Sequence, residues 1–138
     1  MSDYNRAFEY AVGNEGGYSD HPADRGGKTK YGITESTLRR WRGGYVPPEA
    51  VKQLGLEEAR AIYKAWYWDT LSLDGVHSSP IAICLFDIGI VRGIGIPPKY
   101  AQQICNSHGG AHLTLDGVIG PKTIAALNSI EEGIFVRQ

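Results

Sequence analysis

The segment from Ser79 to Gly93 constrains the fold more than any other part of the chain. Ser79-Pro80 is typical of a helix start, and the residues that follow, up to Val91, are apolar on nearly every face. Such a helix should be buried, and it is about half as long as the roughly 20 residues needed to span a membrane. The sequence therefore predicts a core helix, in which Asp87 needs a partner or a proton because an unpaired buried charge is costly.

Shorter periodic segments on both sides predict further helices around a small β excursion. Turn residues between Tyr18 and Ile33 predict an irregular β-hairpin after the first helix. The expected fold is mainly α (α+β). The expected helices run from Ser2 to about Asn14 or Glu15, from the cap Thr34 past the outward-facing Arg39, Arg40 and Arg42, from Glu57 to Trp68, from Pro97-Pro98 to Gly109-Gly110, and from Pro121 onwards.

Charge and composition exclude several functional classes. The chain has 138 residues, 42% of them apolar, which is enough for a real core in one domain. A net charge of -1 does not indicate a nucleic-acid-binding protein, which would carry a basic surface. The sequence also has no polybasic run that would bind a membrane surface. The first residues lack a cationic start and an apolar run, so we expect no secretory signal, no membrane anchor and synthesis in the cytoplasm.

The cysteines and histidines do not indicate a metal or a disulfide framework. Cys84 and Cys105 are too few for a disulfide scaffold, and the apolar neighbours of Cys84 predict a buried free thiol. The four histidines are scattered without zinc-ligand spacing. We therefore predict neither a metal ion nor an organic cofactor.

Two acids and a threonine lie where the first helix gives way to the hairpin. Glu15 would face the negative end of the helix dipole, and partial burial would also raise its pKa towards that of a general acid. Asp24, on a polar glycine-rich loop, should stay ionised, and Thr29 could hold a water molecule. Two carboxyl groups with separated pKa values are what glycoside hydrolysis requires. These three residues are the candidate catalytic group.

Each candidate also has a structural alternative. Glu15 could be a surface acid, Asp24 could brace its loop, and Thr29 could be an ordinary hairpin hydroxyl. Tyr18 and Tyr31 could line a sugar subsite or pin the hairpin. The aromatic stripe that ends at Trp68 fits a core, yet Trp68-Asp69, at the expected exposed end of its helix, best fits a substrate groove.

The ordered motifs resemble a known family. Glu15-Gly16-Gly17-Tyr18, then Asp24-x-Gly26-Gly27-x-Thr29, then Tyr31-Gly32-Ile33-Thr34 looks like the signature of glycoside hydrolase family 108, which comprises N-acetylmuramidases of the lysozyme-like superfamily. The order of acid, acid and threonine is also similar to that of phage-type lysozymes, with one residue fewer between Asp24 and Thr29. The resemblance implies a lysozyme-like helical domain with a small β-hairpin.

The resemblance extends from about residue 7 to residue 128. Asp116-Gly117-Val118-Ile119-Gly120-Pro121-x-Thr123 is similar to the predicted peptidoglycan-binding region of the family. It implies a catalytic region at residues 1–93 and a helical peptidoglycan-binding region at 94–138 packed on it. Two features depart from the family pattern. Val91-Arg92-Gly93 lacks an expected polar residue such as Asn. The chain also ends where relatives continue into another helix, which indicates either a truncated C-terminus or a shortened variant.

The implied function is cleavage of the β-1,4 bond between N-acetylmuramic acid and N-acetylglucosamine, with Glu15 as general acid. It implies a monomeric phage or prophage endolysin that acts on the cell wall and is released through a holin-like pore. The alternative is a non-catalytic peptidoglycan-binding or secretion accessory module with the same fold, against which intact Glu15, Asp24 and Thr29 argue. Amidase or peptidase chemistry lacks the metal ligands or nucleophile-base pair that it requires.

Overall fold

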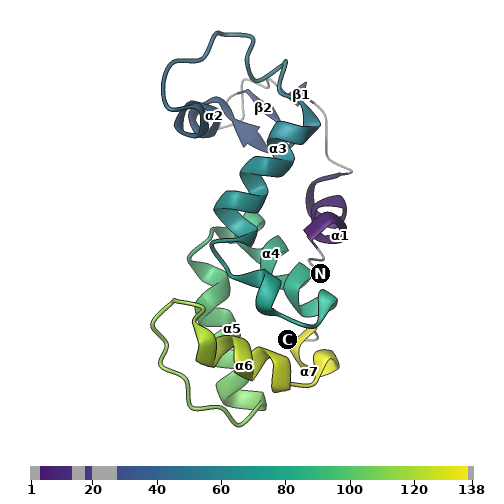
Figure 1. The fold of residues 1–138 in the computed structure, drawn as a ribbon, viewed down its shortest axis with the longest axis vertical. Helices are drawn as coiled ribbons and strands as arrows, with labels where there is room; N and C mark the ends of the chain where they lie inside the picture. The colour runs from purple at the N-terminus through teal and green to yellow at the C-terminus, as the bar shows by residue number, and fades with distance from the viewer. Residues whose placement is uncertain (1–3, 14–17, 20–27, 137–138) are drawn as a thin grey trace. The chain divides into compact units, whose positions relative to one another are not determined.

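The computed structural model describes residues 4–13, 18–19 and 28–136, which form a mainly helical fold with a small antiparallel sheet (Figure 1). This confirms the predicted fold class. The chain forms two compact units, one of residues 8–63 and one of residues 1–7 with 64–138. The boundary expected between residues 93 and 94 falls inside the second unit, so the division into catalytic and binding regions stays a prediction about function.

The elements of the described residues follow one another closely along the chain. They are α1 (Tyr4–Phe8), the π-helical turn η1 (Glu9–Gly13), β1 (Tyr18–Ser19), β2 (Thr29–Lys30), β3 (Ile33–Thr34), α2 (Glu35–Arg42), α3 (Leu56–Tyr63), the π-helical turn η2 (Lys64–Trp68), the 3₁₀ turn η3 (Leu73–Gly75), α4 (Ser79–Arg92), α5 (Ile96–His108), α6 (Pro121–Ser129) and α7 (Glu132–Val136).

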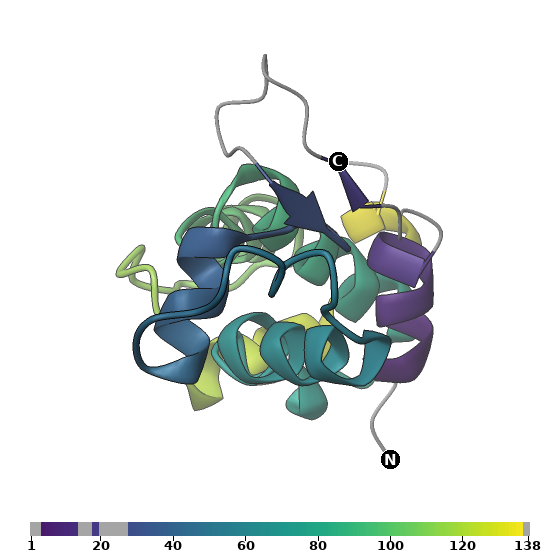
Figure 2. The same cartoon turned by 90° about the horizontal axis from the view of Figure 1, so that it is seen from above.

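The predicted hairpin is a sheet of three short strands in the order β1-β2-β3, all antiparallel. Tyr18 pairs with Lys30, and Thr29 pairs with Thr34. Because the strands are only two residues long, the pairing alone is a weak support, and the sheet depends on what packs on it. Buried Ile33 supplies one such contact to the core of this unit, and Figure 2 shows the sheet beside α2.

A two-residue turn, Tyr31-Gly32, joins β2 to β3. Both residues have positive φ, 54° and 78°, as a type I′ hairpin turn requires. For Tyr31 this backbone costs about 1–2 kcal/mol, because the left-handed region brings Cβ close to the following carbonyl. The hydroxyl of Tyr63, on α3, donates a 2.7 Å hydrogen bond to the Tyr31 carbonyl and holds the turn in this conformation.

Thr34 caps α2, as its position in the sequence predicts. Its hydroxyl accepts a 3.1 Å hydrogen bond from the Thr37 amide. The predicted outward basic face carries ion pairs: Arg39 contacts Glu35 at 2.6 Å, and Arg42 donates to both Glu58 oxygens at 2.9 and 2.6 Å. The hydrogen bond from Arg42 lowers the pKa of Glu58, so this pair links α2 to α3 while both groups are charged.

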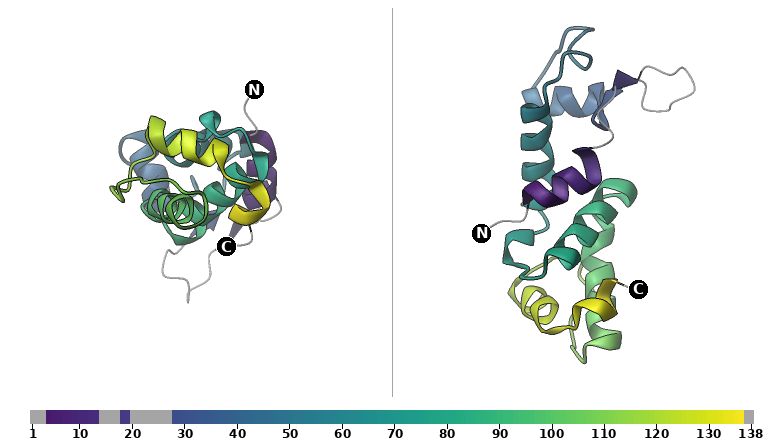
Figure 3. Two further views of the ribbon diagram at one scale, coloured as in Figure 1. Left: turned by 90° about the horizontal axis from the view of Figure 1, so that it is seen from below. Right: turned by 90° about the vertical axis from the view of Figure 1, so that its right-hand side faces the viewer.

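The second unit is built on α4, which begins after the cap Ser78 and ends at Gly93 as expected. Its side chains Leu85 and Phe86 are fully buried, and α5, α7 and η2 all pack against the helix. In Figures 1 and 3, α6 runs across α5. Burial is one-sided, however: Val91 is 73% exposed.

The partial exposure of α4 changes two expectations about its side chains. Asp87 is only half-buried, so water can reach its side chain and the cost of a fully buried charge does not apply to it. Cys84 is likewise half-buried rather than buried, whereas Cys105 is buried. Both cysteines are free, and desolvation raises the pKa of both thiols. Nowhere in the described part of the chain does a helix have the length and apolar character to cross a membrane.

We expect Gly32→Ala to lower the free energy of unfolding by about 2 kcal/mol or more. Alanine would keep the unfavourable positive φ, and its Cβ would lie 2.7 Å from the Tyr63 hydroxyl, which would have to give up its hydrogen bond. Denaturant unfolding measures the difference. Gly44→Ala is the matched control, because nothing lies within 4 Å of a Cβ there. Equal stabilities of the two variants would contradict this account of the turn.

Candidate functional site

Two of the three predicted catalytic residues, Glu15 and Asp24, lie outside the described residues, and their roles stay predictions. The described residues show where the connections that contain Glu15 and Asp24 join the neighbouring elements. Glu15 is in the connection between η1 and β1, and Asp24 is in the connection between Ser19 and Thr29. Ser19 and Thr29 are cross-strand partners, so both ends of the connection that contains Asp24 are anchored on the sheet.

Thr29 is the predicted catalytic residue that the structure describes. It lies on the central strand β2, half-buried, between Ser19 and Thr34. Its hydroxyl makes no hydrogen bond with any other described residue, whereas the Thr34 hydroxyl is occupied at the cap of α2. A hydroxyl without a partner, on a residue that is only half-buried, is available to hydrogen-bond a water molecule or a substrate.

The predicted sugar contacts Tyr18 and Tyr31 are both half-buried. Tyr18 pairs with Lys30, so both point to the sheet face that carries buried Ile33. Thr29, one residue along β2, points to the opposite face. The Lys52 ammonium lies 5.9 Å from the centre of the Tyr18 ring, and the Lys30 ammonium lies 5.5 Å from that of Tyr31. Both tyrosine rings therefore have cationic neighbours. Tyr18 does not lie on the face of the sheet to which Thr29 points.

Trp68 is not at an exposed helix end, which corrects the expectation that it faces a groove. Its side chain is 1% exposed, and its ring packs edge-on against Tyr4 and Phe86 at 5.5 and 5.7 Å between centres. Its indole N–H donates to Asp74 at 2.7 Å. A buried indole presents no face to a sugar, so Trp68 is not one of the proposed substrate contacts.

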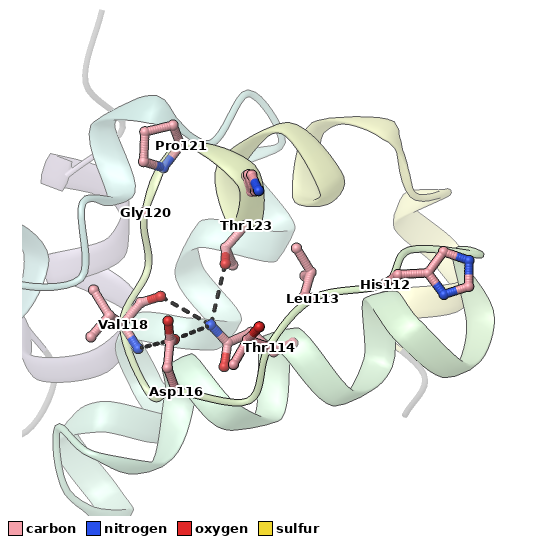
Figure 4. A pocket seen from close by; sticks show the side chains of 10 residues that line it. His112, Leu113, Thr114, Asp116, Val118, Gly120, Pro121 and Thr123 are labelled. Atoms are coloured by element: carbon pink, nitrogen blue, oxygen red, sulfur yellow. Dashed lines mark hydrogen bonds between the residues drawn. The ribbon is translucent and has the colours of Figure 1, made fainter.

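A cavity of about 430 Å³ lies in the second unit, between α5, the loop at residues 112–120 and the start of α6. At its base is Gln102, which is 1% exposed and which the sequence analysis did not single out. Its amide nitrogen donates to Asp116 and to the Val118 carbonyl, both at 2.9 Å, and to Thr123 at 3.3 Å. Figure 4 shows these acceptors converging on the one nitrogen. The motif Asp116-Gly117 identified the loop, but nothing local to Gln102 indicated its role.

The carboxylate of Asp116 is held by neutral donors. The Val118 amide donates to its Oδ1 at 3.0 Å, and this hydrogen bond, followed by that from Gln102, lowers the pKa of Asp116. Gly117 takes the positive φ of 75° that closes the Asp-Gly turn. Both of these hydrogen bonds are accepted by Oδ1, and the Asp116 side chain is otherwise exposed.

A second cavity, of about 460 Å³, shares Gly120 and Pro121 with the first. Its two acids already have partners: Asp69 accepts from the Lys64 ammonium at 2.9 Å, and Asp74 accepts from Trp68. In the parts of the chain that the structure describes, no group of His, Cys, Asp or Glu side chains could hold a metal ion.

Comparisons with known proteins cover nearly the whole chain. The model of the family described as Glycosyl hydrolase 108 matches residues 8–93. Among solved structures, the chain is similar to the one titled "Structure of Brucella abortus SagA", with a TM-score of 0.80 and 32% sequence identity over 97% of this chain and 73% of that chain. A comparison with curated proteins finds no significant match.

We expect Gln102→Leu to lower the free energy of unfolding by roughly 2 kcal/mol or more. The substitution removes the hydrogen bonds to the Val118 carbonyl, the Gly117 amide and the buried Thr123 hydroxyl, and each lost hydrogen bond costs about 0.5–1.5 kcal/mol. Thermal or denaturant unfolding measures the loss. Gln103→Leu is the matched control, because Gln103 is the exposed next residue on the same helix. If the two variants unfolded alike, the network at Gln102 would not support the loop.

The lowered pKa of Asp116 predicts a pH dependence of stability. A carboxyl group whose pKa is lower in the folded state stabilises the fold above its unfolded pKa, about 3.9, and loses that contribution as the pH falls through the folded value. Wild type should therefore be more stable than Asp116→Asn at neutral pH, and the gap should narrow below about pH 4. Melting temperatures of both proteins across this range test the prediction, and a gap that widened in acid would contradict it.

Proposed function

Because the chain belongs to the glycosyl hydrolase 108 family, we propose that it cleaves the β-1,4 bond between N-acetylmuramic acid and N-acetylglucosamine in bacterial peptidoglycan. Family membership makes the chain a glycoside hydrolase, with peptidoglycan as the substrate class. The observation that carries the finer proposal is that the matched residues, 8–93, contain the whole ordered signature of Glu15, Asp24 and Thr29.

In the proposed reaction, Glu15 is the general acid. Its proton passes to the glycosidic oxygen as the bond from that oxygen to the anomeric carbon breaks. Asp24, as a carboxylate, either accepts a proton from the attacking water or stabilises the positive charge that develops on the sugar. The water oxygen forms the new bond to the anomeric carbon, so the products are two shorter glycans, one with a new reducing end.

Thr29 is proposed to hold the attacking water. Three described features support this role: Thr29 is half-buried, its hydroxyl has no hydrogen-bond partner among the described residues, and the residue lies on the central strand. Its strand position limits how far the hydroxyl can move, and its pairing with Ser19 puts it at the end of the connection that carries Asp24. Tyr18 and Tyr31 remain proposed sugar contacts.

The remaining parts of the proposal concern the cellular role. We infer that residues 94–138 bind peptidoglycan, in support of which the similarity to the Brucella abortus structure extends over 97% of the chain. We further infer a monomeric endolysin of a phage or prophage that is made in the cytoplasm, leaves it through a holin-like pore and acts on the cell wall. These inferences depend on the family to which the chain belongs.

We expect Glu15→Gln to reduce wall hydrolysis by on the order of 10²–10⁴-fold, because glutamine cannot donate the proton that the leaving oxygen needs. Loss of turbidity of purified cell walls and release of reducing ends measure the activity. Glu49→Gln is the matched control, since it removes one carboxylate from an exposed side chain of the same unit.

The same assay separates the proposal from its alternative. A Glu15→Gln protein that hydrolysed walls as fast as wild type would contradict the assignment of Glu15 as the general acid. A wild-type protein that sedimented with intact walls and released no reducing ends would instead be a binding or accessory module. Activity of Glu49→Gln should match that of wild type in either case.

A further inference from the structure

The cavity at residues 112–123 has the size and the walls of a binding site. Its volume of about 430 Å³ is in the range of small-molecule sites, about 300–1,000 Å³, and its position is fixed from below by the buried Gln102. Apolar atoms come from Leu113, Val118 and Pro121, and Val118 is 62% exposed although large and hydrophobic. The base of this cavity is polar, and an exposed apolar side chain at its edge is available to cover a bound ligand.

Two opposite charges line this cavity without neutralising one another. Asp116 and Lys122 both face it, and neither side chain forms an ion pair with a described residue. His112 also lines the cavity. The cavity thus offers one anion that hydrogen bonds hold in place and one cation without an ion-pair partner among the described residues to a single ligand.

We propose that this cavity binds the part of a peptidoglycan stem peptide that carries both a free ammonium and a free carboxylate group. Oδ1 of Asp116 is occupied by Gln102 and the Val118 amide, so Oδ2 accepts from the ligand ammonium. The Lys122 ammonium donates to the ligand carboxylate. The proposal rests on peptidoglycan being the substrate, and it names the chemical part of that polymer which the region at residues 94–138 recognises.

The charges favour the peptide over the glycan strand. The N-acetylated sugars carry no ammonium group, so a glycan lying in the cavity would cover Asp116 without giving it a cationic partner. Covering a charged group without such compensation costs free energy. A diamino acid in a stem peptide supplies the ammonium and carboxylate together, and its methylene groups can lie on Leu113 and Val118.

A structural role accounts for Asp116 but not for Lys122. The hydrogen bonds on Asp116 brace the loop, whereas the Lys122 side chain makes no hydrogen bond with the described residues and is exposed. Replacement of Lys122 should therefore leave the melting temperature unchanged while it weakens binding. This difference makes Lys122→Gln the decisive variant, and Asp116→Asn the second one.

The test is titration calorimetry with soluble stem peptides that have no sugar. One peptide contains a diamino acid with a free side-chain amine and a free carboxylate, the second has that amine acetylated, and a peptide-free N-acetylglucosamine oligosaccharide is the third probe. Since the peptides contain no glycosidic bond, binding is measured independently of hydrolysis. A failure of the proposed function in the wall assay is therefore distinguishable from a failure here.

Wild type should bind the free-amine peptide at least about tenfold more tightly than the acetylated one, as expected for loss of a charged hydrogen bond. Lys122→Gln and Asp116→Asn should each weaken binding by a similar factor. Arg92→Gln and Glu131→Gln, which remove exposed charges of the same unit outside the cavity, should bind as wild type does. Equal binding of both peptides, binding of the oligosaccharide alone, or no binding by wild type would each overturn the proposal.

Discussion

The burial of α4 is the constraint on which the second unit depends. Its buried face, with Leu85 and Phe86, is covered by elements from both sides of it in the sequence: η2 precedes it, and α5 and α7 follow it. Residues 64–93 of the expected catalytic region therefore share one core with the expected binding region. Residues 94–138 cannot be regarded as a module added to a finished domain, because without them the apolar surface of α4 would meet water.

Charged groups are used in two different ways. Where acids support the fold, as Glu35 and Glu58 do, an arginine lies against each of them and cancels its charge. Asp116 is held instead by an amide side chain and a backbone N–H, which are neutral and leave its charge intact. An anion that is fixed in place without being neutralised is preorganised for a cation from outside the protein.

Local chemistry made much of the fold predictable from the sequence. The cap at Thr34, Ser79-Pro80 at the start of α4 and the proline at the start of α6 act through neighbouring atoms, so their residue types indicate the helix boundaries directly. The burial of Trp68 and the role of Gln102 depend on partners that are distant in the sequence, on α4 and in the loop after α5. A periodic pattern identifies an apolar stripe, but it does not indicate which end of the stripe a neighbouring helix will cover.

In the candidate site too, features that depend on neighbouring residues were predictable, and those that depend on the pairing of strands were not. The motif placed Thr29 beside a turn, and the sheet register then put its hydroxyl on the face opposite Tyr18, which spacing alone could not resolve. The π-helical turns η1 and η2 were not foreseen either, because they require the same residue types as an α-helix.

The turn at Tyr31-Gly32 has a consequence for how this chain can vary. A two-residue loop has no slack, so one inserted or deleted residue there would slip β2 against β3 and turn Thr29 to the other face. The connection between Ser19 and Thr29 is longer, and the entropy of closing such a connection changes slowly with its length. Homologous chains should therefore differ in the length of the connection between Ser19 and β2, and they should keep the number of residues between β2 and β3 constant. Gaps in an alignment of such chains should fall in the first connection and not in the second.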